Sequence, residues 1–302
     1  MSTVLASSTD STPPGATPQP LHRSRGYWAS VWLRLRRDPV AVGAAVVVLV
    51  LIALALFGPW IAPSDPYQAS MLKRLKPIGT QGLPLGSDEL GRDMLSRLIV
   101  GARLSLFIGI TPVLCAFVFG TMIGIVAGYA GGIVNTLIMR TIDVFYAFPS
   151  VLLAIALSGT LGAGVVNSLI SLTIVFIPQI ARVAESVTTQ VRTRDYVEAA
   201  RASGAGPFTI VRVHVLGNVL GPIFVYATSL IAVSMILASG LSFLGLGVKP
   251  PEPEWGLMLN TLRTAIYVQP WVAALPGAMI FITSISFNIL SDGLRSAMDN
   301  KG

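Results

Sequence analysis

The sequence predicts an all-α integral membrane protein with six membrane-spanning helices, on two observations. Only 12% of its 302 residues are charged and 53% are hydrophobic, whereas an ordinary soluble domain is about 25% charged. Long stretches without any charged residue recur along the chain, and each can supply the roughly 20 apolar residues that a span needs. The one cysteine, Cys115, lies inside such a stretch, which excludes an internal disulfide and a cysteine-rich metal site.

The N-terminal part predicts a tail followed by a retained first span. Residues 1–26 are expected to be a disordered cytoplasmic tail, because the first 20 are rich in Ser, Thr and Pro and poor in large apolar groups. The uncharged run 39–64 exceeds the roughly 7–15 apolar residues of a signal peptide. The basic residues just before it predict a cytoplasmic N-terminus, and six spans then place the C-terminus on the same side. These basic residues are Arg23, Arg25, Arg34, Arg36 and Arg37.

Charge-free windows predict the remaining spans. The window 144–181 is interrupted at Gly159–Gly164, where glycines indicate a connection outside the bilayer between two short helices. We expect an N-terminal region, 27–102, that holds the first span and an outer loop, and a transmembrane domain, 103–302. The six spans are expected near residues 40–62, 104–128, 142–160, 165–182, 219–246 and 271–292.

Two features of the spans predict helix contacts. Gly120, Gly124 and Gly128 repeat every four residues, which lets a second helix approach closely, within the chain or in a sister subunit. Arg140 and Asp143 are spaced for an ion pair on one helix. An interfacial pair is the simpler interpretation of these two charges, and a proton relay is the alternative.

No stretch of the sequence carries a recognisable catalytic motif. The segment Gly86–Asp93 (GSDELGRD) has glycines at the spacing of a phosphate loop, but Arg92 and Asp93 replace the required Lys and Ser or Thr. Carboxylates are nearly absent from the expected spans, whereas an ion-coupled carrier usually keeps some there. We therefore expect no enzymatic activity, no bound cofactor and no nucleic-acid partner.

The longest polar segment on the expected inner side extends roughly from Arg182 to Arg212. Small residues crowd the stretch 199–206, glycines there allow a sharp turn, and Pro207 suits the first turn of a new helix. A small-residue helix can pack into a groove of a partner while its charges set the register. Two interpretations remain open on these grounds, a docking site and a solvated connector.

The stretch EAARASG (198–204) followed by VHVLGNVLGPI (213–223) resembles the EAA loop of ABC-importer permeases. The segments 84–106, 143–157, 241–259 and 276–299 also resemble the C-type permease subunit of dipeptide and oligopeptide importers. Together they extend the resemblance from about residue 30 to the end of the chain. Where the family usually has proline, this chain has Gly217, so a bend there is less firmly fixed.

This resemblance implies a type I ABC-importer permease architecture in the bacterial inner membrane, with the EAA loop near 183–222. It implies a second permease, two ATPase subunits that hold ATP and Mg, and an extracytoplasmic peptide-binding protein. The loop's coupling helix would contact the ATPases. The residues implied in that contact are Glu198, Ala199, Ala200, Arg201, Gly204 and Pro207.

Several alternatives remain open. The same architecture could import nickel, glutathione or another small solute, and a stand-alone channel or secondary carrier is a more distant alternative. The outer segments Gly86–Asp93 and Val248–Trp255 are either contacts for the binding protein or structural turns, with Trp255 suited to a membrane interface. The polar residues of the spans either line the translocation path or form hydrogen bonds with one another between helices. These are Asn167, Ser171, Gln179 and Asn288.

Overall fold

The computed structural model describes residues 27–299, and the regular elements in this part of the chain are all helical. The tail expected for residues 1–26 lies outside the described residues. The α-helices are α1 (Tyr27–Leu35), α2 (Pro39–Ile61), α3 (Met94–Ala130), α4 (Gly132–Tyr146), α5 (Ser150–Leu161), α6 (Val165–Arg192), α7 (Asp195–Ala202), α8 (Pro207–Ile210), α9 (Leu216–Phe243), α10 (Trp255–Thr261) and α11 (Pro270–Asp299). Shorter segments are the 3-10 turns η1 (Met71–Lys73) and η3 (Ala265–Tyr267) and the π-helical η2 (Val211–Val215).

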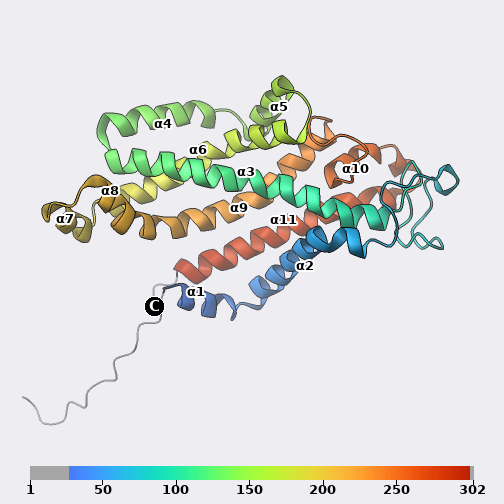
Figure 1. Ribbon diagram of the computed structural model, residues 1–302, viewed down its shortest axis with the longest axis horizontal. Helices are drawn as coiled ribbons and strands as arrows, with labels where there is room; N and C mark the ends of the chain where they lie inside the picture. The colour runs from blue at the N-terminus through green and yellow to red at the C-terminus, as the bar shows by residue number, and fades with distance from the viewer. Residues whose placement is uncertain (1–26, 300–302) are drawn as a thin grey trace, which may run out of the picture.

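The long helices α2, α3, α6, α9 and α11 run side by side along the molecule (Figure 1). At one end lie α7 and α8, together with the last turns of α3 and α6. At the other end lie α10 and the irregular segment 62–93 (Figure 1). The two ends therefore present different kinds of structure, which we call the inner and the outer end.

Five helices are long and apolar enough to cross a membrane: α2, α3, α6, α11 and the continuous helical segment 207–243. The sixth candidate is the pair α4 and α5, which is bent by 86°. The third span expected at 142–160 therefore corresponds to this bent pair, which begins earlier, at Gly132. Pro149 precedes α5 and lacks an N–H group, and proline disfavours a helical conformation at the residue before it.

The ends of other helices also differ from the ends of the charge-free windows. Helix α3 begins at Met94, ten residues before the expected start, because Asp93 caps it by accepting a hydrogen bond from the Ser96 N–H group. Helix α6 continues through the charged residues to Arg192, so the inner loop begins at Thr193. The expected break at Gly159–Gly164 is present, between the end of α5 and the start of α6.

The packing of α3 on α6 is the most extensive helix contact in the described part of the chain. A Cβ atom added to Gly120 would lie 3.0 Å from the carbonyl oxygen of Ile177, and one added to Gly128 would lie 2.7 Å from that of Glu185. Gly124, between them, would meet the carbonyl oxygen of Ala181. The glycine stripe thus faces α6, where missing side chains allow close backbone approach.

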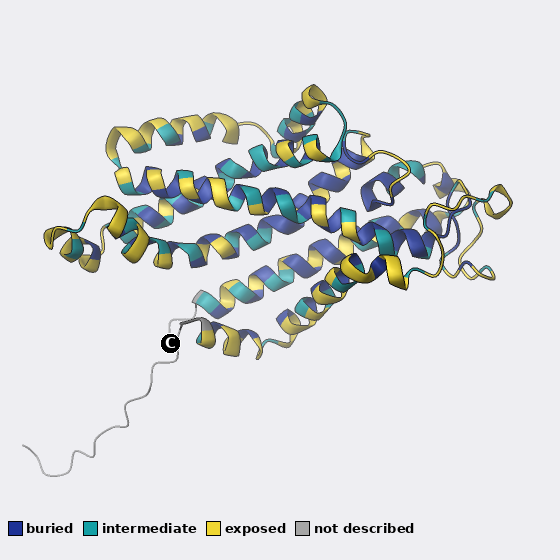
Figure 2. Ribbon diagram, viewed as in Figure 1, coloured by how far each residue is buried: buried dark blue, intermediate teal, exposed yellow. Residues whose placement is uncertain are grey.

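Burial follows the pattern of a membrane bundle. Buried positions line the seams between helices, while exposed positions alternate with them on the outside (Figure 2). Many exposed side chains on α2 and α3 are large and apolar, including Leu49 at 63% and Met122 at 61% exposure. Such faces suit lipid or a partner within the membrane, rather than water.

Candidate functional site

Helix α7 ends in a closed turn that requires Gly204. The Gly204 N–H group donates to the carbonyl oxygen of Arg201 at 3.0 Å, and the Ala205 N–H group donates to that of Ala200 at 3.1 Å. This is the Schellman arrangement of a helix C-terminus, in which the residue at the position of Gly204 is left-handed. Gly204 has φ +84°, and Pro207 then occupies the first turn of α8. The Gly-Ala-Gly-Pro sequence thus fixes the angle between two helices.

One side of this segment is anchored to the bundle. Val197 of α7 and Ile210 of α8 are 0% and 1% exposed, and both belong to the main hydrophobic core. Ala200 and Ala205, which the turn brings together, are partly buried against the same core. The segment is therefore a firmly seated projection and not a loose connector.

The other side of the segment is exposed at the inner end (Figure 2). Of the residues implied in coupling, Ala200 faces the core in part and the remaining five are exposed. A Cβ atom on Gly204 would meet no other atom within 4 Å. The exposed residues are Glu198, Ala199, Arg201, Gly204 and Pro207.

Two aromatic residues on this projection were missed by sequence reasoning. Phe208 is 77% exposed and Tyr196 is 44% exposed. Aromatic side chains are enriched in protein interfaces relative to the rest of the surface. The available signal was an aromatic residue directly after Pro207 in a polar segment. We refer to the exposed residues of α7 and α8, with Tyr196 and Phe208, as the coupling surface, after the role that the sequence resemblance implies for this segment.

The helix that leads from the coupling surface into the bundle contains a π-helical turn at Val211–Val215. Its defining hydrogen bond joins the Leu216 N–H group to the carbonyl oxygen of Val211. Gly217 follows within regular α9, and a Cβ atom added to it would meet no other atom within 4 Å. The irregularity expected at Gly217 therefore lies a few residues earlier. Such π-helical turns are frequent at functional sites.

The elbow between α4 and α5 carries an ion pair that differs from the expected one. Asp143 pairs with Arg182 of α6, and both side chains are part-exposed. The guanidinium of Arg182 also lies 5.7 Å from the ring centre of Tyr146, within cation–π range. The expected pairing of Asp143 with Arg140 is wrong, because a tertiary partner takes the place of the one on the same helix.

A cavity of about 410 Å³ lies beside the elbow. Gln179 of α6 lines it and donates a hydrogen bond to Ser150 at 3.4 Å. Asn167 instead bonds the carbonyl oxygens of Leu161 and Gly162, so it closes the α5–α6 turn. Ser171 bonds the carbonyl oxygen of Asn167, and Asn288 is exposed on α11. Of the four polar span residues, Gln179 is the one that lines this cavity.

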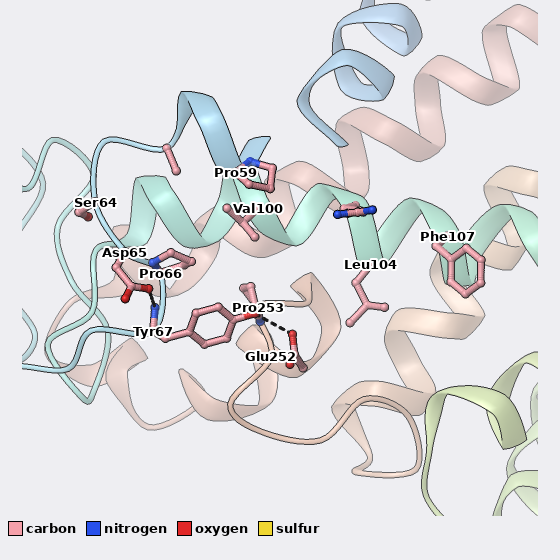
Figure 3. A pocket seen from close by; sticks show the side chains of 12 residues that line it. Pro59, Ser64, Asp65, Pro66, Tyr67, Val100, Leu104, Phe107, Glu252 and Pro253 are labelled. Atoms are coloured by element: carbon pink, nitrogen blue, oxygen red, sulfur yellow. Dashed lines mark hydrogen bonds between the residues drawn. The ribbon is translucent and has the colours of Figure 1, made fainter. Parts of the chain in front are cut away.

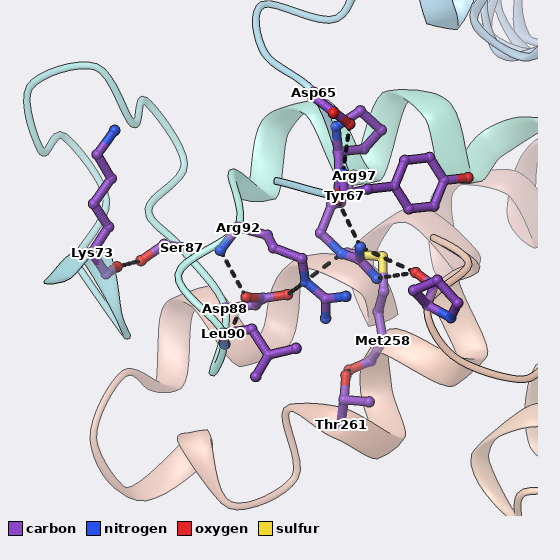
Figure 4. A network of polar contacts seen from close by, with 12 residues as sticks. Asp65, Tyr67, Lys73, Ser87, Asp88, Leu90, Arg92, Arg97, Met258 and Thr261 are labelled. Carbon is purple, nitrogen blue, oxygen red and sulfur yellow. Dashed lines mark hydrogen bonds and ion pairs between the residues drawn. The ribbon is translucent and has the colours of Figure 1, made fainter. Parts of the chain in front are cut away.

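At the outer end, the segment Gly86–Asp93 folds around a buried carboxylate (Figure 4). Asp88 accepts hydrogen bonds from the backbone N–H groups of Leu90 and Arg92, each at 2.9 Å. It also pairs with the side chains of Arg92 at 2.6 Å and Arg97 at 3.5 Å. These three side chains are at most 7% exposed. The structure thus favours the interpretation of this motif as a structural turn.

The second outer segment is fixed in a similar way. Trp255 is fully buried, and its indole N–H group donates to the carbonyl oxygen of Leu98 at 3.0 Å. The membrane-interface position expected for Trp255 is therefore wrong. Glu254 caps α10 by accepting from the N–H groups of Gly256 and Leu257, both at 2.8 Å. Burial raises the pKa of Glu254, although these backbone donors oppose the shift.

Comparison with known proteins agrees with this architecture. Residues 120–301 match the binding-protein-dependent transport system inner membrane component, and residues 26–77 match the N-terminal TM domain of oligopeptide transport permease C. The inward-facing MetNI methionine ABC transporter has the same fold over 68% of this chain and 97% of its own, with a TM-score of 0.56 and 20% identity.

Curated relatives cover nearly the whole chain. The glutathione transport system permease protein GsiD of Pectobacterium atrosepticum is 42% identical over 277 residues, which is 92% of each chain. The di/tripeptide transport system permease protein DppC of Pseudomonas aeruginosa is 41% identical over 89% of this chain and 91% of its own. The chain therefore belongs to the family of inner-membrane permease components of binding-protein-dependent ABC importers.

Proposed function

We propose that this chain is one permease subunit of an ATP-driven importer of short peptides. Its partners are a second homologous permease, two cytoplasmic ATPase subunits and an extracytoplasmic peptide-binding protein. ATP and Mg belong to the ATPases, and this chain contributes half of the translocation path and no catalytic group. The proposal rests on the family and on relatives whose names specify di/tripeptide and glutathione transport.

The coupling surface is the observation that carries this proposal. A helix with exposed small residues and an exposed Phe208 projects from the inner end on a closed turn. A partner helix groove can accept small residues closely, and an aromatic side chain can anchor the contact. We therefore assign the coupling surface as the contact for the ATPase.

The proposed orientation places this end in the cytoplasm of a bacterium, with both termini on that side of the inner membrane. Helix α1 packs against the last turns of α11 through Val31 and Ala297, and both lie toward the end that carries α7 (Figure 1). A cytoplasmic ATPase would then have access to the coupling surface and to both termini.

Movement of the ATPase would be transmitted from α7 to the membrane helices through packed contacts. A displacement of α7 by the ATPase would also displace α8, because Val197 of α7 and Ile210 of α8 are both buried in the core on either side of the Gly204 turn. It then reaches α9, which packs on α3, α6 and α11. The π-helical turn Val211–Val215 is the place where this connection departs from regular helix. Movement of the projection would thereby alter the packing of the central helices.

A substitution at Ala199 tests this proposal. Ala199 is an exposed helix residue, so Ala199→Trp leaves the fold intact and blocks a closely packed partner. We expect ATPase copurification and peptide uptake to fall together. Ala69→Trp is the matched control, since Ala69 is also exposed but lies at the outer end. Unchanged copurification and uptake in Ala199→Trp would show that the coupling surface is not the ATPase contact.

Glutathione is the second candidate substrate, because the relative GsiD is as similar as the peptide permease. Both substrates are short peptides with a free ammonium and free carboxylates. Uptake of labelled dialanine and of labelled glutathione by cells expressing the complete transporter, each with the other compound unlabelled as competitor, separates them. Dialanine uptake that glutathione does not inhibit supports the peptide importer, and glutathione uptake without dialanine uptake supports the alternative.

A further inference from the structure

A cavity of about 930 Å³ lies at the outer end, between the end of α2, one face of α3 and the segment before α10 (Figure 3). Pro59, Val100, Leu104 and Phe107 form its apolar side. Its size is in the range of ligand-binding pockets. It is independent of the coupling surface, which lies at the opposite end of the molecule (Figure 1).

The polar side of this cavity carries charges of both signs. Arg103 of α3 is exposed there and forms no hydrogen bond or ion pair with any residue that the structure describes. Glu252 accepts a hydrogen bond from the Tyr67 hydroxyl at 2.9 Å, and Asp65 accepts one from the Tyr67 N–H group at 2.9 Å (Figure 3). The ion pairs of the described residues involve neither carboxylate.

With the outer end of α2 taken as the membrane surface, the position of Arg103 along α3 places it within the bilayer. Ser96 accepts a hydrogen bond from the Ser64 N–H group, so it lies level with the outer end of α2. Arg103 is seven residues farther along α3, which is about 10 Å toward the bilayer centre at 1.5 Å per residue. Trp60, which follows the lining residue Pro59 and is 80% exposed, suits the membrane interface.

An exposed cation at this depth needs an anion. A charged side chain costs about 2.5–3.5 kcal/mol at the centre of a membrane helix, and arginine reduces such a cost by reaching toward the head groups. The guanidinium fork matches a phosphate with two parallel hydrogen bonds. The outer leaflet supplies phosphates directly above the position of Arg103.

We propose that this cavity binds a phospholipid whose head group combines a phosphodiester with a primary ammonium, as in phosphatidylethanolamine. Arg103 binds the phosphate, and Glu252, which Tyr67 separates from Asp65, binds the ammonium. The start of an acyl chain lies over Leu104 and Phe107. Carboxylates of Glu252 and Asp65 line the same cavity as Arg103, so a head group that carries both a phosphate and an ammonium complements it better than a purely anionic one.

The test uses the complete transporter in nanodiscs with equal amounts of phosphatidylethanolamine, phosphatidylglycerol and phosphatidylcholine. Native mass spectrometry counts the lipids that remain bound. We expect phosphatidylethanolamine to be enriched, and Arg103→Gln to lower its retention about tenfold, the loss expected for a charged hydrogen bond. Arg263→Gln, which removes an exposed outer arginine that does not line the cavity, should leave retention unchanged.

A second variant separates the two halves of the head group. The Glu252→Gln side chain still accepts a hydrogen bond from the Tyr67 hydroxyl but carries no charge. This variant should therefore abolish the preference for phosphatidylethanolamine over phosphatidylglycerol. Retention without head-group preference, or retention insensitive to Arg103→Gln, would overturn the proposal. A photo-crosslinker at Phe107 that captures a protein instead of lipid would also overturn it, because the cavity would then be a subunit interface.

Discussion

The two ends of the molecule are held in different ways. The outer end fixes itself, since Asp88, Arg92 and Arg97 are buried and bonded to one another and Trp255 bonds the backbone of α3. At the inner end, the coupling surface is seated by Val197 and Ile210 but leaves Phe208 and its charged residues exposed. Buried charges that satisfy one another indicate a structural role, whereas exposed aromatic residues are typical of surfaces that contact another protein. Substitutions in each region test these two roles.

The largest effect is expected at Asp88. Asp88→Asn leaves Arg92 and Arg97 buried without a counter-charge, and breaking a buried pair costs about 3–5 kcal/mol. We expect the free energy of unfolding to fall by that order in reversible chemical unfolding in mixed micelles. Glu89→Gln is the control, because Glu89 is only partly buried and glutamine still accepts from Thr264. Equal losses in the two variants would contradict the structural role of Asp88.

A smaller effect is expected at the glycine stripe. The methyl group of Gly124→Ala would meet the backbone of α6 at Ala181 and the side chain of Ala184. Overpacking of this kind costs about 1–3 kcal/mol, measured by the same unfolding assay. Gly159→Ala in α5 has open space around the added carbon, so it should be neutral or slightly stabilising. A neutral Gly124→Ala would show that α3 and α6 are not closely packed.

The smallest effect concerns pH at the outer end. The folded pKa of Glu254 is raised above its ordinary value of 4.5 by burial. Its contribution to stability is therefore complete below pH 4.5 and is lost as pH rises through the folded pKa. Subtracting the pH profile of Glu254→Gln from that of the wild type should reveal this decline. A difference that rises with pH would mean that the hydrogen bonds from Gly256 and Leu257 outweigh burial.

Sequence reasoning located most of the fold because lipid imposes its own rule. A span must be apolar over about 20 residues, so charge-free windows found α2, α3, α6, α9 and α11. The elbow between α4 and α5 was missed, because an apolar window does not show where a helix bends. Only Pro149 signalled it, and a proline within an apolar run is compatible with both a kink and a helix start.

Side-chain partners were harder to predict than helices. The spacing of Arg140 and Asp143 favours a local pair, but Arg182 of another helix competes for Asp143. The exposure of Phe208 depends on which side of a four-residue helix faces the core, and Ile210 occupies that side. Both outcomes follow from tertiary packing, which a single sequence does not specify.

The most direct measurement of the central claim is photo-crosslinking in the native membrane from the two ends. A photoreactive residue at Phe208 probes the coupling surface, and one at Leu90, which is 47% exposed, probes the outer end. We predict that Phe208 captures an ATPase subunit and that Leu90 does not. Capture of lipid or of no protein from position 208, in membranes where the transporter is active, would contradict the assignment of the inner end as the ATPase-coupling surface.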